Sequence, residues 1–393
     1  MSRPSLLLIS MGELATHLLE AVARTDVFDT IVVASRDLEK AKKRTNNAVL
    51  GAGIEGFFPR IVAEKLDVHS NDFSTRLREI KPDFIFSAPS LLPWWKLAPD
   101  GIDIPFAGYT ALHLSLMQKF RNRIAQSGIN AIWIGASFPD VINAMLNRTG
   151  FGPDYGIGNV QEPIAKIQIG IGQELNCSPK DVEVKLVAQH AFEYYVLNDH
   201  KPDKLPPYLL KATLSGKDVT QLAEDVLREV FPFPYDLHFN RVTASSGLVA
   251  LRALVGETER LIHLPGIGTL VGGYPVRAGK SRITIDLPDE WSLEQAIAVN
   301  EASLKWDGID EMTKDGTIVF TVETQKALRK LLGKTIETLS TETAQDQAND
   351  LLYALRYCLL YTSPSPRDQR GSRLPWYACK KKGGGGGGGG GGG

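Results

Sequence analysis

Short apolar segments alternate with amphipathic segments along the first 150 residues, and this alternation constrains the fold more than any other feature of the chain. The apolar segments are nearly uninterrupted, as in strands of a sheet covered on both faces, and the segments between them have the period of helices. This order predicts an α/β domain, a doubly wound parallel sheet over residues 1–150. The predicted strands are Ser5–Ser10, Thr30–Ala34, Ile61–Leu66, Asp83–Ser87 and Ala131–Ala136, and the predicted helices are Glu13–Arg24, Asp37–Thr45, Asp72–Ile80 and Ala111–Gln126.

The second half of the chain has a different pattern, with longer helical segments and strands in which apolar and polar residues alternate. Such strands are typical of antiparallel sheets, so we expect residues 151–357 to form an α+β domain that binds the substrate. The predicted helices are Val160–Leu175, Val219–Val230, Ala244–Leu254 and one beginning at Glu323, and the predicted strands are Val182–Gln189, Ser281–Leu287 and Gly316–Val322.

Residues 358–393 are expected to lie outside both domains and not to be native sequence. The segment Cys358–Asp368 (CLLYTSPSPRD) resembles a translated sequencing adapter, and Gly383–Gly393 has no side chains that could pack. Without this stretch, 38 basic residues face 44 acidic ones, a formal charge of −6. That charge argues against binding to nucleic acid or to a membrane, so a small-molecule partner is expected.

Cysteine and histidine usage excludes further classes of site. Cys177 is the only cysteine of residues 1–357, which rules out a disulfide framework and a cysteine zinc site there. The histidines have no metal-ligand spacing, so no metal is expected. No apolar run approaches the roughly 20 residues of a membrane span, and we expect a cytoplasmic protein.

The turn after the first predicted strand has the pattern of a degraded dinucleotide-binding motif. Gly12 stands where the backbone must approach phosphates closely and Ala15 where the helix packs closely, while Ser10 replaces the first glycine. The alternative is that Gly12 only makes a tight turn, and the neighbouring Glu13 would compete with a phosphate. The literal GxGxxG motif at Gly51–Gly56 follows a helix pattern instead of a strand, and is interpreted as unrelated to nucleotide binding.

The end of the second strand indicates which nucleotide is bound. An acidic residue there would bind the adenosine ribose of NAD, but this chain has Ala34-Ser35-Arg36, and a guanidinium suits the 2′-phosphate of NADP. We therefore expect NADP in preference to NAD, unless Arg36 is only a solvated surface residue. The candidate cofactor-binding residues are Ser10, Gly12, Ala15, Ser35, Arg36, Ser87 and Ser137.

The later motifs, in their order along residues 5–335, resemble those of the lactate/malate dehydrogenase superfamily. In that family the Rossmann domain ends in a strand followed by Ser-Asn-Pro-Val-Asp, and here Ile134–Val141 reads IGASFPDV. A Val-Ile-Gly segment and a helix come next in the family, where this chain has Gly156–Asn159 and Val160–Leu175. The family's strand ending in Gly-Glu-His-Gly corresponds to Leu186–Ala191. The family's later strand and closing helix resemble Gly273–Gly279 and Glu323–Leu332.

This resemblance implies a Rossmann-type domain followed by a lactate/malate dehydrogenase-like α+β domain, and an NAD(P)-dependent oxidoreductase acting on a hydroxyl or carbonyl group. It makes His190 the general acid–base, a role that suits imidazole near neutral pH. Glu162 falls at the family's orienting aspartate if one residue is inserted, and Lys166 falls where the family has a substrate-binding arginine. The family usually forms dimers or tetramers, so the resemblance also implies a homo-oligomer.

Several departures from the family leave the substrate and the activity open. Phe138 replaces the family's substrate-facing asparagine, and the loop Pro89–Ala107 contains Trp94-Trp95-Lys96 but no arginine. These changes indicate a larger or more apolar substrate than a 2-oxo acid, or a loop that packs down. A second interpretation is a saccharopine-dehydrogenase-like NADP reductase, which Val33–Asp37 resembles, and a third is a non-catalytic dinucleotide-binding sensor or assembly subunit. In that last case His190 is a structural residue at a strand end.

Overall fold

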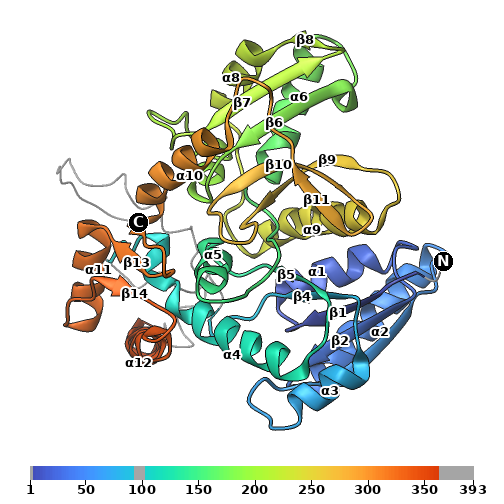
Figure 1. Cartoon of the computed structure of the whole chain (residues 1–393), viewed down its shortest axis with the longest axis vertical. Coiled ribbons are helices and arrows are strands. Elements are labelled where there is room, and N and C mark those ends of the chain that lie inside the picture. Colours follow the sequence, from blue (N-terminus) through green and yellow to red (C-terminus); the bar gives the residue numbers. More distant parts are fainter. Residues whose placement is uncertain (1–2, 93–101, 363–393) are drawn as a thin grey trace, which may run out of the picture.

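The computed structural model describes residues 3–92 and 102–362 of the chain. Five parallel strands form one sheet in the order β3-β2-β1-β4-β5, which is a Rossmann-type order and confirms the predicted doubly wound sheet (Figure 1). The strands are β1 (Ser5–Ile9), β2 (Thr30–Ser35), β3 (Arg60–Lys65), β4 (Phe84–Ser87) and β5 (Ile132–Gly135). The helices of this part are α1 (Glu13–Val22), α2 (Leu38–Ile54), α3 (Phe73–Ile80), η2 (Phe106–Tyr109), α4 (Ala111–Ser127) and α5 (Val141–Arg148).

The rest of the described chain contains three antiparallel sheets of three strands, in the orders β6-β7-β8, β11-β10-β9 and β12-β13-β14. The strands are β6 (Val182–Val187), β7 (Leu209–Leu214), β8 (Lys217–Asp218), β9 (Arg260–Pro265), β10 (Gly273–Gly279), β11 (Arg282–Ile285), β12 (Ile309–Met312), β13 (Ile318–Phe320) and β14 (Thr338–Leu339). The helices are α6 (Gln161–Glu174), η3 (Pro179–Asp181), α7 (Ala191–Val196), α8 (Thr220–Arg228), η4 (Leu237–Phe239), α9 (Asn240–Val255), α10 (Leu293–Asp307), α11 (Val322–Leu332) and α12 (Ala344–Thr362).

Two hydrophobic cores cover the two faces of the parallel sheet. Successive residues of a strand face opposite sides, so Leu6 and Leu8 of β1 belong to one core, with α1, α2 and α9, while Leu7 belongs to the other, with α3 and α4. Helix α9 comes from the second half of the chain and packs on α1 (Figure 1). This contact holds α1, and with it the Gly12 turn at the carboxyl end of β1, against the second half of the chain.

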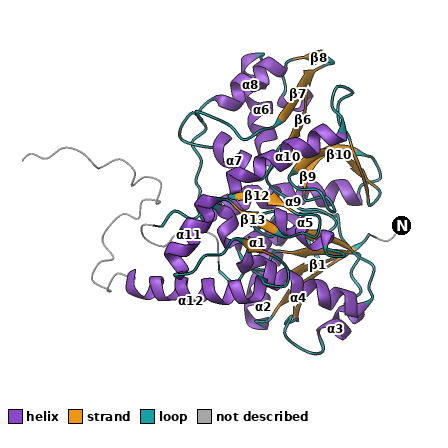
Figure 2. Ribbon diagram, turned by 60° about the vertical axis from the view of Figure 1, so that its left-hand side comes forward, coloured by secondary structure: helices purple, strands orange, loops and turns teal. Residues whose placement is uncertain are grey.

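The end of the described chain returns to the first domain. Ile318 of β13, Leu328 of α11 and Leu351 of α12 share one core with Leu112 and Phe120 of α4. Figure 2 shows α11 and α12 beside the sheet domain. Residues on both sides of the predicted boundary at residue 150 therefore share one core, and the boundary itself stays a prediction. Helix α12 ends within the stretch that we expect not to be native.

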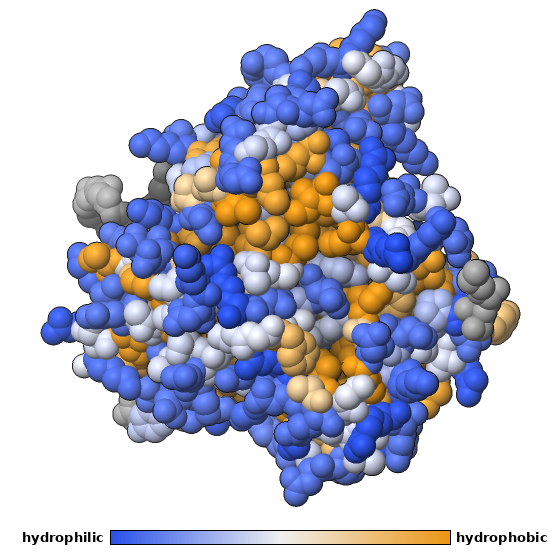
Figure 3. Space-filling view, in the orientation of Figure 1, coloured by the Kyte–Doolittle hydropathy of each residue, from blue (hydrophilic) through white to orange (hydrophobic). Residues whose placement is uncertain are grey.

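The sheet β11-β10-β9 carries an apolar surface, visible as the orange area near the middle of Figure 3. Partly buried side chains from this sheet and from the segments beside it pack around the buried ring of Tyr274: Leu209 of β7, Ile267 and Leu270 between β9 and β10, Ile285 of β11, Leu287 and Trp291 after it, and Ile297 of α10. Apolar surfaces of this kind often mark contacts between proteins.

Within the described part of the chain, none of the helices combines the length and the apolar character that a membrane span requires.

Candidate active site

A cavity of about 630 Å³ connects the carboxyl ends of the parallel strands with the second half of the chain. Its lining includes Gly12 at the start of α1, Arg36 after β2, Ser137 after β5, and His190 just before α7. Ligands of open α/β sheets bind at this edge, where the strand order reverses. The structure thus brings together two sets of residues that are far apart in the sequence, the dinucleotide turn and the candidate acid–base.

The turn between β1 and α1 has the backbone shape that the motif requires, although it lacks the first glycine. Ser10 has φ +75°, in the left-handed region that glycine adopts most readily, and its amide donates a hydrogen bond to the Ala34 carbonyl at 3.1 Å. Gly12 precedes α1 with φ −75°, and a Cβ added to it would meet no atom within 4 Å. The space beside Gly12 and the free amides of the first helical turn therefore suit a phosphate group.

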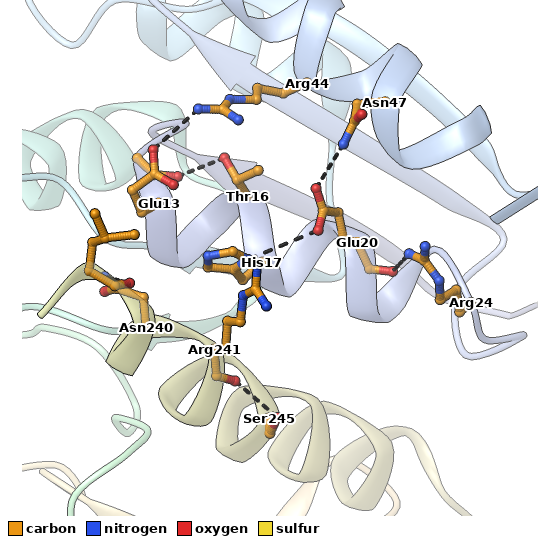
Figure 4. Close-up of polar contacts among 12 residues, drawn as sticks. Glu13, Thr16, His17, Glu20, Arg24, Arg44, Asn47, Asn240, Arg241 and Ser245 are labelled. Atoms are coloured by element: carbon orange, nitrogen blue, oxygen red, sulfur yellow. Dashed lines mark hydrogen bonds and ion pairs between the residues drawn. The ribbon is translucent and has the colours of Figure 1, made fainter. Parts of the chain in front are cut away.

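Glu13, which would compete with a phosphate, has a partner of its own. Figure 4 shows its carboxylate turned toward Arg44 of α2, and the two side chains are 3.2 Å apart. On the other side of α1 lie Asn240 and Arg241 of α9. The ion pair offsets the negative charge of Glu13 at the mouth of the turn, so this residue argues less against phosphate than the sequence suggests.

The end of β2 presents basic side chains to the same cavity. Arg36 is exposed and lines the cavity, and Lys40 in the first turn of α2 does so as well. Asp37 does not compete for them, because its carboxylate caps α2 by accepting a hydrogen bond from the Lys40 amide at 2.9 Å. Ser35 also lines the cavity, and its hydroxyl accepts a hydrogen bond from the Asp37 amide at 3.1 Å.

One of the seven candidate cofactor-binding residues faces away from the cavity. Ser87 is fully buried, and its hydroxyl accepts a hydrogen bond from the Trp133 indole at 2.8 Å, so it belongs to the core between β4 and β5. The other six, among them Ala15 and Ser137, line the cavity. The literal glycine motif at Gly51–Gly56 lies in the last turn of α2 and just beyond it, not at a strand end.

His190 is oriented by a carboxylate that sequence reasoning missed. Its Nδ1 lies 2.9 Å from Oδ1 and 3.0 Å from Oδ2 of Asp307, the last residue of α10, and both side chains are buried. The Gln189 side-chain amide also donates a hydrogen bond to Oδ2 of Asp307, at 2.5 Å, and helps to hold the carboxylate in place. Because Nδ1 faces Asp307, Nε2 is the ring nitrogen left to exchange a proton with a molecule in the cavity.

The surroundings of His190 favour its charged form. Burial alone would lower the pKa of His190, but the charge and hydrogen bond of Asp307, together with the charges of Asp140 and Glu162, raise it above the ordinary value. A second histidine of the cavity lining, His113, has no such carboxylate, and burial lowers its pKa to about 4. Of these two imidazoles, His190 is the one suited to carry a proton near neutral pH.

Two aromatic rings pack against the His190 imidazole, and a third lies beside one of them. The centroid of Phe138 lies 5.0 Å from it and that of Phe106 lies 5.3 Å from it, both edge-on. Tyr194 of α7 contacts Phe106 at 5.6 Å and lines the cavity. These rings form an apolar part of the wall beside His190, which strengthens the electrostatic interactions among the charged groups at this end of the cavity.

Glu162, the predicted orienting residue, is near His190 but does not hold it. It is buried in the first turn of α6 and lines the cavity beside Glu193 of α7 and Thr243 of α9. Burial raises the pKa of Glu162, and burial together with the neighbouring Glu162 raises the pKa of Glu193 well above its usual range. The orienting position belongs to Asp307 instead, because α10 ends directly at His190.

Lys166, predicted at the position of a substrate-binding arginine, is turned away from the cavity. Its ammonium donates hydrogen bonds to the carbonyls of Val196, Leu227 and Glu229 at 2.7, 2.8 and 2.7 Å. These carbonyls end α7 and α8, where a cation is favourable with respect to the helix dipoles. All three N–H donors of the Lys166 ammonium bind backbone carbonyls, so Lys166 holds the ends of two helices and has no donor left for a ligand.

The loop residues Trp94, Trp95 and Lys96 lie outside the described residues.

The fold is that of lactate and malate dehydrogenases. By sequence, no described protein family and no curated protein matches the chain. By structure, the chain is similar to a lactate dehydrogenase from a Medee basin deep-sea metagenome library, with a TM-score of 0.56 at 11% identity over 78% of this chain and 97% of that one. It is also similar to malate dehydrogenase from Cryptosporidium parvum (TM-score 0.56, 12% identity, 77% and 96% covered) and from Aeropyrum pernix (0.54, 15%, 77% and 97%). The predicted Rossmann-type domain followed by an α+β lactate/malate dehydrogenase-like domain is confirmed.

Proposed function

We propose that this protein is a nicotinamide-dependent oxidoreductase that interconverts a hydroxyl and a carbonyl group on a small molecule. The observation that carries the proposal is the cavity that is lined both by Gly12 and by His190. A dinucleotide seated on the Gly12 turn would reach along this cavity toward the imidazole. The fold shared with lactate and malate dehydrogenases supports the same conclusion.

The phosphate end of the cofactor would lie on the turn between β1 and α1. The open space at Gly12 and the unpaired amides at the start of α1 fit a pyrophosphate, and the left-handed Ser10 brings the backbone close to it. Arg36 and Lys40 would bind the 2′-phosphate of NADP, which is why we propose NADP as the preferred cofactor over NAD. When bound, the nicotinamide donates a hydride to the substrate carbon or accepts one from it.

His190 would move the accompanying proton at Nε2. In the reducing direction the protonated imidazole donates its proton to the carbonyl oxygen while the oxygen becomes a hydroxyl, and in the oxidising direction the neutral imidazole removes that proton. Asp307 holds Nδ1 and stabilises the imidazolium, so it is a positioning residue. The rings of Phe106 and Phe138 keep water away from the proton transfer.

The experiment is a dehydrogenase screen with both nicotinamides on 2-hydroxy acids, amino alcohols and sugars, using the His190→Asn variant. Asparagine removes the proton carrier, and we expect turnover to fall by about 100-fold or more. His113→Asn is the matched control, because His113 lines the same cavity but has a pKa of about 4. Full activity of His190→Asn would contradict the proposed role.

The main alternative is a dinucleotide sensor without catalysis, favoured by the position of Lys166 away from the cavity. Such a sensor would turn over no substrate in the screen, and its His190→Asn variant would bind NADPH with wild-type affinity.

Self-association is a separate proposal, with the apolar surface around Tyr274 as the candidate contact. Sedimentation of the purified chain gives the oligomeric state directly.

A further inference from the structure

We propose that the substrate end of this cavity binds an organic cation, so that the substrate carries an ammonium group close to the carbon that reacts. This inference rests on the proposed function for the reaction, but the charge preference follows from the cavity itself. The dehydrogenases that share the fold act, by their names, on lactate and malate, which are anions. The described residues around His190 have the opposite character.

Four buried carboxyl groups lie around His190 at this end of the cavity. Asp307 is used by His190, while Asp140, Glu162 and Glu193 line the cavity. The exposed fractions of these three residues are 6%, 7% and 7%, so solvent does not screen them. Carboxyl groups are almost never this deeply buried without a partner.

Among the described residues, no lysine or arginine pairs with these three carboxyl groups. Asp140 interacts with Asn159, and Glu162 interacts with Thr243 and Glu193, and none of these partners carries a positive charge. The three side chains come from different elements, the start of α5, the first turn of α6 and α7, and they meet at one cavity wall. Buried carboxyl groups that converge on a cavity without a lysine or arginine indicate a missing cation, and an ammonium group has three donors and a compensating charge.

Basic side chains are absent from this wall. The described lining residues between Ala136 and Thr243 include no lysine or arginine, and Lys166 is committed to helix carbonyls. The cations of the lining, Arg36, Lys40 and Arg356, lie on α2 or beside it and on α12. An anionic substrate would therefore find no lysine or arginine to bind its charge beside His190, whereas a cation would find carboxyl groups that can ionise and bind it.

The remaining wall favours an organic cation over a metal ion. Phe138, Tyr194, Tyr235 and Phe239 line the same end, and aromatic faces attract ammonium groups. Among the residues that the structure describes, no group of three histidine, cysteine or carboxylate side chains is arranged to hold a metal. The apolar rings would contact the carbon skeleton while the carboxylates contact the charge.

Isothermal titration calorimetry with n-butylammonium and with butyrate tests this inference directly. We expect saturable binding of n-butylammonium to the wild type and at least tenfold weaker binding to Glu162→Gln and to Glu193→Gln. Both substitutions keep the shape of the side chain, and thermal unfolding verifies the fold of each variant. Glu183→Gln, an exposed position on β6, is the matched control and should bind as the wild type does.

Binding should also release protons, because burial raises the pKa of Asp140 and of Glu162 and a bound cation favours their ionised forms. The heat of binding then differs between buffers of different ionisation enthalpy. Tighter binding of butyrate than of n-butylammonium, or equal binding of the ammonium to wild type and both variants, would overturn the inference.

NADPH titration of the same samples separates this inference from the proposed function. If NADPH binds and n-butylammonium does not, the charge preference is wrong and the oxidoreductase assignment stands. If n-butylammonium binds through Glu162 and NADPH does not bind at all, the cation site stands and the oxidoreductase assignment fails.

Discussion

Nδ1 of His190 lies 2.9 Å from Oδ1 of Asp307, and the two residues are 117 positions apart in the chain. His190 comes from the segment between β6 and α7, and Asp307 ends α10. Each is nearly inaccessible to solvent, so a low-dielectric environment surrounds the pair. This pair defines which ring nitrogen of His190 faces the cavity.

Replacing Asp307 by asparagine should lower the pKa of His190, because the charge and the hydrogen bond that raise it are lost. Turnover should fall by about 100-fold with a smaller change in KM, since the imidazolium is no longer stabilised. NMR titration of the His190 imidazole measures the pKa without any substrate. An unchanged His190 pKa in Asp307→Asn would show that the carboxylate has no electrostatic role.

Replacing Lys166 by methionine should destabilise the fold by about 2–4 kcal/mol, because three buried carbonyls at helix ends lose a charged donor. NADPH affinity should not change, since Lys166 does not line the cavity. The measurement is urea denaturation. Lys201→Met is the control: that lysine pairs with Glu229 on the surface, 61% exposed, and its loss should cost less than about 1 kcal/mol.

Asp140 should make the protein less stable as the pH rises. Burial raises the pKa of Asp140 to about 6, although His190 and Asn159 offset part of the rise, and Asp307 adds to it. The folded protein therefore holds a proton that the unfolded chain has lost, and this contribution disappears between roughly pH 4 and pH 7.

The Asp140→Asn variant tests this dependence, because asparagine does not titrate. The free energy of unfolding of the variant minus that of wild type should increase by about 1.5 kcal/mol when the pH is raised from 5 to 8. The comparison also includes the effect of the Asp140 charge on its neighbours, because that charge raises the pKa of His190 and of Glu193. A wild-type–variant difference that is equal at pH 5 and pH 8 would contradict the role of burial.

Arg36→Ala and Lys40→Ala should each weaken NADPH binding by about tenfold and leave NADH binding nearly unchanged. Both side chains are exposed, so solvent screening keeps the effect modest. Fluorescence titration with both nucleotides measures it. The control is Lys42→Ala, an exposed residue of α2 that pairs with Glu39 and does not line the cavity. An equal loss of affinity for NADPH and NADH would show that these side chains do not bind the 2′-phosphate.

The sequence predicts the first domain well because its strands are short apolar runs that alternate regularly with amphipathic helices. The apolar runs of β1, β2 and β4 stand out between turns, and the spacing from the end of β5 to His190 matches the dehydrogenase order. Gly12 is also predicted from its place at a strand-to-helix turn. In these regions local pattern and tertiary packing agree.

The sequence does not predict α10, and with it Asp307, because the buried face of that helix is small or polar. Its buried residues are Ala296, Asn300, Ser303, Leu304 and Asp307, which have the helical spacing without the apolar character that periodicity methods detect. The role of Lys166 depends on the carbonyls of residues 196, 227 and 229, which lie where the ends of α7 and α8 meet α6. Contacts of this kind appear only in the folded chain.

The most direct test of a dinucleotide on the β1–α1 turn is NADPH fluorescence titration of the Gly12→Val variant. Gly12 has φ −75° and free space around a Cβ, so valine should fold normally but fill the volume of the phosphates. Gly53→Ala, in the literal but helical glycine motif, is the control, since its Cβ would make only an ordinary contact with Phe58 at 3.6 Å. We predict that Gly12→Val loses NADPH binding by at least about tenfold with an unchanged melting temperature, while Gly53→Ala binds as wild type does. Wild-type NADPH affinity in a folded Gly12→Val protein would contradict the account.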